Sequence, residues 1–96
     1  MGNALEDSIY ILSEKIDASN IELAKHELLK FIEKNNIVTV DGSIVEEIDG
    51  FGLQLLLSAH KYCFTKSKPF SLIGASNILR TVLELTGFLD LIDEEY

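Results

Sequence analysis

Short apolar runs rich in β-branched residues alternate with longer stretches of helical periodicity along almost the whole of this 96-residue chain. The clearest run covers residues 37–40, Ile-Val-Thr-Val, and is typical of a strand buried in a parallel sheet. Parallel neighbours need crossover connections, and the apolar face of each crossover helix needs a sheet to cover. The alternation therefore predicts an α/β layer, and the length predicts one domain over residues 1–96.

Local signals predict the individual elements. Apolar residues at helical spacing predict helices over residues 21–34, about 51–65 and about 77–86, the last ending at Gly87. Ser19 or Asn20 is expected to cap the first helix, and Ser76 or Asn77 the third. Strands are expected at residues 8–12, 37–40 and 70–73, with a short strand or turn in 13–17, a short lead-in at 45–48, and an edge strand or helical turn at 88–92.

Composition excludes several classes of partner. Eight basic against sixteen acidic residues leave a formal net charge of -8, a field that repels phosphate backbones and anionic lipid surfaces. No apolar run is long enough to cross a bilayer, and the first residues lack the charge and apolar core of a signal peptide. We therefore expect a cytoplasmic protein that neither binds nucleic acid nor inserts into membranes.

The corner Asp49-Gly50-Phe51-Gly52 leads from the expected lead-in strand directly into an apolar helix. The Asp49 side chain can cap that helix, and glycines tolerate the backbone angles of a corner. In open α/β sheets the loops after the carboxyl ends of strands form the functional edge. This corner is therefore the predicted functional surface, and no serine or threonine lies between Asp49 and Leu57.

Motifs of common catalytic and cofactor sites are missing. Gly50 and Gly52 lack the third glycine of a dinucleotide fingerprint, and the chain has no phosphate loop and no Gly-x-Ser-x-Gly elbow. His60 and Cys63 lie three residues apart, but two ligands without a carboxylate cluster make a poor metal site. Cys63 is expected to be a buried thiol in an apolar helix. We predict no catalytic residue, no metal and no cofactor, and hence no enzyme.

Ordered segments of the chain resemble a known family. Residues 40–53, Val-Asp-Gly-Ser-Ile-Val-Glu-Glu-Ile-Asp-Gly-Phe-Gly-Leu, resemble the signature of the STAS family, the sulfate-transporter and anti-sigma-factor-antagonist domain. That signature has an Asp-Leu-Ser strand end before an Ile-Asp-Ser-Ser-Gly-Leu corner. Residues 69–74 look like the family's fourth strand, and residues 80–88, Arg-Thr-Val-Leu-Glu-Leu-Thr-Gly-Phe, look like its helix ending. The matching places in the signature are held by Asp41, Ser43, Ile48, Asp49, Gly52 and Leu53.

The resemblance implies an STAS-like α/β fold, with a four- to five-stranded mixed sheet and three to four helices packed mainly on one side. It also implies a non-enzymatic bacterial module of the anti-sigma-factor-antagonist type, active in signal transduction and transcription regulation through protein-protein contact. The partner would be an anti-sigma factor or serine kinase, a transporter ATPase or a chemotaxis-type kinase, and the chain would be a monomer or weak homodimer. The partner-binding residues it implies are Asp49, Gly50, Phe51, Gly52, Leu53 and Gln54.

The chain departs from the family pattern at two positions. In phosphorylatable members the serine directly after the aspartate is the switch, and Gly50 in its place has no oxygen to phosphorylate. Ser43 and Ser58 are the nearest hydroxyls; Ser43 is expected to close the turn after its strand, and Ser58 lies two helical turns in. Phe51 replaces a small residue, and is either an exposed anchor for a partner or part of the core.

The second helix is apolar around much of its circumference. One of two stripes should cover the sheet, and the other is either a partner surface or packs on the third helix. The first stripe is Leu53, Leu56, Leu57 and Phe64, and the second is Leu55, Ala59, Tyr62 and Cys63.

Three other functions stay open: a subunit stabilising a lipid-transport ABC ATPase, a member of a chemotaxis-type signalling cluster, and a nucleotide- or anion-binding module at the helix start.

Overall fold

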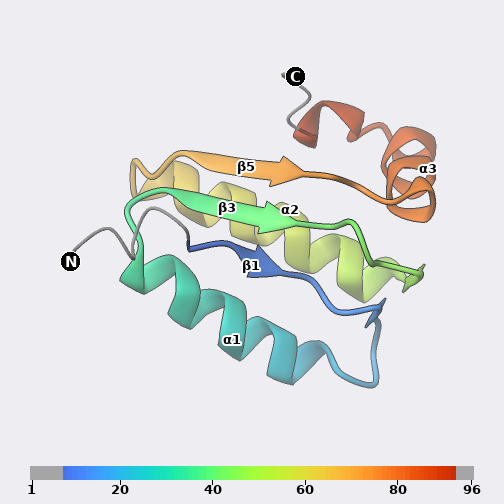
Figure 1. The fold of residues 1–96 in the computed structure, drawn as a ribbon, viewed down its shortest axis with the longest axis horizontal. Coiled ribbons are helices and arrows are strands. Elements are labelled where there is room, and N and C mark those ends of the chain that lie inside the picture. The colour runs from blue at the N-terminus through green and yellow to red at the C-terminus, as the bar shows by residue number, and fades with distance from the viewer. Residues whose placement is uncertain (1–7, 93–96) are drawn as a thin grey trace.

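The computed structural model describes residues 8–92, in which helices and strands follow one another in the predicted order (Figure 1). The α/β fold class is confirmed, with three α-helices and five short strands in this part of the chain. The elements are β1 Tyr10–Ile11, β2 Lys15–Ile16, α1 Ile21–Lys34, β3 Val38–Asp41, β4 Glu47–Ile48, α2 Gly50–Thr65, β5 Phe70–Ile73, α3 Asn77–Thr86 and the 3-10 helix η2 Leu89–Leu91.

The strands form two sheets. The larger has the order β1-β3-β5 and the smaller pairs β2 with β4. All of these pairs are parallel, whereas a mixed sheet was expected. Residues 8–92 contain no antiparallel strand pair. In the larger sheet Tyr10 lies opposite Val40, which lies opposite Leu72. A single parallel bridge from Leu72 to Ile92 brings the end of the described chain beside β5.

One face of the larger sheet is buried under the helices. Val38, Val40 and Leu72 point to this face and are fully buried, whereas Ile11 lies in register with Asp41 on the opposite face and is exposed. Helices α1 and α2 pack against each other along the sheet, and α3 lies beyond the carboxyl ends of β3 and β5 (Figure 1). The smaller sheet lies at the end of the molecule where α1 and α2 begin.

Helix ends follow the capping rules at α3 and depart from them at α1. The Ser76 hydroxyl accepts a hydrogen bond from the Leu79 amide at 3.2 Å, and Gly87 ends α3 with φ of 86°, as predicted. Asn20 holds the N-cap position of α1, but its side chain makes no capping bond. Its Oδ1 instead accepts the Asp17 amide at 3.0 Å, so Asn20 is the N-cap residue as predicted but its side chain does not cap the helix.

The predicted division of α2 into two apolar stripes is confirmed only in part, because the second stripe supplies three of the four buried apolar side chains and the first stripe supplies the fourth. Its buried apolar side chains are Leu55, Leu56, Ala59 and Cys63, drawn from both stripes, because these positions share one face at 3.6 residues per turn. Phe64, assigned to the stripe with Leu56, is 79% exposed. When a helix is apolar around nearly its whole circumference, its sequence does not show which face is buried. Within residues 8–92 no helix is long and apolar enough to cross a membrane.

Candidate functional site

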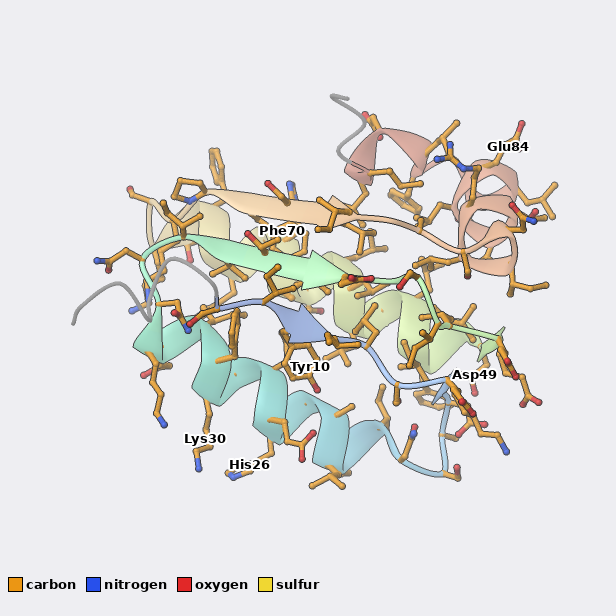
Figure 2. The ribbon with its side chains drawn as sticks, viewed as in Figure 1. Tyr10, His26, Lys30, Asp49, Phe70 and Glu84 are labelled. Atoms are coloured by element: carbon orange, nitrogen blue, oxygen red, sulfur yellow. The ribbon has the colours of Figure 1, made fainter. Side chains whose placement is uncertain are left out.

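The predicted corner lies between β4 and α2. Figure 2 shows Asp49 at the end of the molecule where both long helices begin. The two helices therefore run in the same direction, and their first turns lie beside the small β2–β4 sheet. Backbone bonds join these segments: the Asp49 amide donates to the Ile16 carbonyl oxygen at 3.3 Å.

The Asp49 carboxylate holds the corner together. Its Oδ1 accepts the amides of Phe51 at 2.9 Å and Gly52 at 3.0 Å, which confirms the predicted cap of α2. Its Oδ2 accepts the amide of Ala18 at 3.0 Å, from the loop that precedes α1. Both oxygens are thus engaged by backbone amides, and the side chain ties the starts of α1 and α2 to each other.

The two glycines of the corner have different surroundings. A Cβ at Gly52 would overlap the backbone carbonyl oxygen of Ile16 and lie 2.8 Å from Cγ1 of Ile48, so only glycine lets α2 approach β2 this closely. A Cβ at Gly50 would meet nothing within 4 Å. Position 50 therefore opens to solvent.

Phe51 is 61% exposed, so of the two alternatives open from the sequence the structure places its ring outside the core. Gln54, one turn further on, is exposed, and its Nε2 donates to the Ser58 hydroxyl at 3.0 Å. Gly52 is buried, and Leu53 is half-buried against the core. Of the six predicted docking residues, Asp49, Gly50, Phe51 and Gln54 reach the surface.

Sequence reasoning missed a groove that starts at this corner and runs between α1 and α2. Its volume is about 510 Å³, and Phe51 and Gln54 belong to its wall. On the floor, small Ala59 lies between larger apolar side chains of both helices. The spacing of Phe51, Leu55 and Ala59 at every fourth residue indicates a common face of α2, but which helix lies opposite depends on the tertiary fold.

Carboxylates gather around the corner. Glu14, Glu46 and Glu47 lie on or beside the β2–β4 pair, where the amides of the latter two both donate to the Glu14 carbonyl oxygen. Lys15 is the cation within this pair, and its Nζ lies 3.9 Å from Glu47 Oε1. The pKa of Asp17 is lowered, chiefly because the Ser19 hydroxyl donates to its carboxylate. The corner is therefore negatively charged at neutral pH.

The remaining candidate groups have structural surroundings. Ser43 donates its amide to Asp41 Oδ1 at 2.8 Å and closes the turn after β3. The His60 ring meets Phe70 edge-on, with ring centroids 5.4 Å apart. Cys63 is fully buried, as predicted, and desolvation raises the pKa of its thiol. Among the described residues no three His, Cys, Asp or Glu side chains lie together as a metal site would require.

Comparisons with known proteins agree with this geometry. The family profile of the STAS domain matches residues 3–95. A solved structure described as that of the anti-sigma factor antagonist SpoIIAA in its unphosphorylated form superposes with a TM-score of 0.73. The match covers 90% of this chain and 76% of that chain at 15% sequence identity, so this likeness concerns the fold. No curated protein matches the chain. The family match covers nearly all of the sequence, and the chain belongs to the STAS domain family.

Proposed function

We propose that this chain is a cytoplasmic protein-docking module of the anti-sigma-factor-antagonist type, which acts by contact alone and is not phosphorylated at position 50. The observation that carries the proposal is the corner at the start of α2. There Phe51 projects into solvent from a backbone that the Asp49 carboxylate holds in place. The docking surface we assign consists of Asp49, Gly50, Phe51 and Gln54, while Gly52 and Leu53 support it from beneath.

Phe51 has the properties of an interface anchor. Aromatic side chains carry a large part of the binding energy in protein interfaces, and they do so best when little ordering is needed on binding. Phe51 follows directly on a capped helix start, so its backbone is already ordered in the free protein. An exposed aromatic ring at the family's regulatory corner therefore supports docking.

The surroundings of Asp49 argue against the alternative of an anion- or nucleotide-binding module. A helix start binds phosphate when its amides point at the ligand unpaired. Here the amides of Phe51 and Gly52 already donate to Asp49, as does that of Ala18. A phosphate at this place would have to displace a carboxylate of its own charge sign.

Regulation at this corner would differ from that of phosphorylatable relatives. A phosphoserine adds a charge of about -1.5 to -2 at a docking surface. Gly50 removes the acceptor hydroxyl, and the next hydroxyl on α2 is that of Ser58, two turns further along. We expect binding of the partner to be governed by its concentration or state, and not by modification of residues 49–53.

The test is capture of the partner from native cytosol, followed by calorimetric titration with the purified partner. Phe51→Ala should weaken binding by about 10-fold or more, the usual cost of truncating an aromatic anchor. Phe64→Ala is the matched control, because Phe64 is an exposed phenylalanine on the same helix, outside the corner and the groove. Both variants should melt like the parent protein.

Several results would overturn the proposal. Equal affinities of the Phe51→Ala variant and the parent would remove the corner from the interface. A covalent phosphoryl group within residues 49–53, or saturable nucleotide binding there, would restore a switch or a ligand site. The identity of the captured protein also selects the system: an anti-sigma factor or serine kinase supports the proposal, whereas a transporter ATPase or a chemotaxis-type kinase indicates one of the alternatives.

A further inference from the structure

The groove between α1 and α2 is bounded by side chains from corresponding positions of two parallel helices. On α1 it extends from Ile21 to Ile32, and on α2 from Phe51 to Tyr62. Each of these segments rises about 16 Å, which is three helical turns. At the far end the Tyr62 hydroxyl donates to Glu33 Oε2 at 2.8 Å and joins the two helices. The groove therefore has a defined length, with the corner at its other end.

The floor is apolar, and the walls combine apolar side chains with Glu22, Lys25, Gln54 and Ser58. Leu28, Ile32, Leu55 and Ala59 form the floor and belong to the buried core, while Leu29 stands on the wall and is exposed. All of these residues lie within helices, whose backbone amides and carbonyls are paired internally. An extended peptide would find no backbone partner here, whereas an amphipathic helix needs only an apolar groove.

Charge is distributed unevenly along the groove. At the corner end Glu22 and Lys25 stand on the groove wall one turn apart, and Asp17, Glu46 and Glu47 on and beside the β2–β4 pair outnumber Lys15, which lies 3.9 Å from Glu47. The corner end therefore keeps a net negative charge. At the far end the Lys66 ammonium lies 5.5 Å from the centre of the Tyr62 ring, so the Glu33 carboxylate bonded to Tyr62 has a cation on the same tyrosine. A ligand with positive charge at one end should therefore bind in the orientation that places this end above the corner.

We infer that the α1–α2 groove receives an amphipathic helix of the partner protein, with apolar side chains in the groove and Lys or Arg residues over the carboxylates of the corner. This inference rests on the proposed docking function and extends it from the corner to the length of the groove. A second copy of this chain is disfavoured because each copy carries a formal charge of -8. A small apolar molecule would leave the corner carboxylates without a counter-charge.

A designed peptide pair tests the inference on the intact protein. The first probe is a helical peptide of about 14 residues, with leucines at positions i, i+4 and i+7 and three lysines in one terminal turn. The second has glutamates in place of the lysines. The lysine peptide should bind with chemical-shift changes at Leu29 and Ser58, and the glutamate peptide should bind about 10-fold more weakly at low salt. Rising salt should reduce this difference.

Two pairs of variants locate the binding. Ser58→Trp fills the groove from an exposed position, while His60→Trp adds the same ring at an exposed position that does not line it. Leu29→Gln removes an exposed apolar side chain from the groove wall, while Leu23→Gln does so elsewhere on α1. The groove variant of each pair should lose about 10-fold or more in affinity for the lysine peptide, and its control should bind like the parent.

Other outcomes contradict the inference. Absence of binding, or equal binding of both peptides, would exclude a basic amphipathic helix. A dimer in sedimentation equilibrium that Ser58→Trp dissociates would assign the groove to a second copy, and saturable shifts with lauric acid alone would assign it to a small apolar ligand. If Phe51→Ala impairs capture of the native partner but Ser58→Trp and Leu29→Gln do not, the proposed function stands and the groove inference falls. If none of these variants impairs capture, both fall.

Discussion

The dipeptide Asp-Gly occurs twice in this chain, and the two copies form loops with opposite roles. One follows β3 as Asp41-Gly42, and the other joins β4 to α2 as Asp49-Gly50. In both, the aspartate Oδ1 accepts the amide two residues further on, at 2.8 Å in the Asp41 loop and 2.9 Å in the Asp49 corner. This one bond is common to both loops, and Asp49 additionally accepts the amides of Gly52 and Ala18.

The two loops differ in what packs on them. A Cβ at Gly42 would lie 2.5 Å from Leu79 Cδ2, because α3 covers this loop, and the Gly42 carbonyl oxygen accepts the Ser76 amide at 3.0 Å. Nothing lies within 4 Å of the corresponding point at Gly50. The Asp41 loop thus joins the sheet to α3, whereas the Asp49 corner stays available to a partner. Exposure, and not the dipeptide, separates the packed Asp41 loop from the corner that we propose as a docking surface.

The largest expected effect concerns the glycine that supports the exposed corner. Gly52→Ala would drive a methyl group into the Ile16 backbone carbonyl, which cannot rotate away, and should cost about 3 kcal/mol of unfolding free energy. Gly42→Ala meets the end of the flexible Leu79 side chain and should cost only about 1 to 2 kcal/mol. Urea unfolding with unchanged m-values measures both losses. A larger loss at Gly42 than at Gly52 would mean that the corner is less rigid than the Asp41 loop.

A smaller effect is expected at the two aspartates. Asp49→Ala leaves three backbone amides without their acceptor and should cost about 2 kcal/mol. Asp41→Ala removes the acceptor of the Ser43 amide and should cost about 1 kcal/mol. Asp49→Asn keeps an oxygen for the Phe51 and Gly52 amides but turns a nitrogen that cannot accept towards the Ala18 amide, so its stability should lie between those of the parent and of Asp49→Ala. Equal melting curves for the two alanine variants would show that the bonds from Gly52 and Ala18 add nothing to the one bond that both loops share.

Local signals account for what the sequence predicted well. The observed bounds of α1 and β5 are the predicted ones, and the Ser76 and Gly87 ends of α3 and the Asp49 cap of α2 follow from residues within one helical turn. The corner could be singled out in advance because strand end, cap and helix start are contiguous in the chain.

Remote contacts account for what could not be predicted. The bond from the Ala18 amide to Asp49 joins residues 31 positions apart, and the separate β2–β4 sheet depends on the same approach. The groove exists because α1 lies beside α2. The periodicity within one helix does not show which other helix packs against it. The sequence left open which stripe of α2 is buried, because Leu53 and Phe64 are as apolar as the residues that face the core.

The smallest expected effect is at Gly50, and it separates the two loops most directly. Gly50 is the first residue of α2 with open space around it, so Gly50→Ala should leave stability unchanged or raise it by up to about 1 kcal/mol, because alanine loses less backbone entropy on folding. Gly50→Ser should change stability by less than about 0.5 kcal/mol while adding an exposed hydroxyl at position 50. Thermal unfolding measures the first effect, and calorimetric titration with the captured partner measures whether either side chain alters docking. A clear destabilisation by either substitution would place Gly50 with Gly42 among the packed glycines, and the contrast between the two loops would no longer hold.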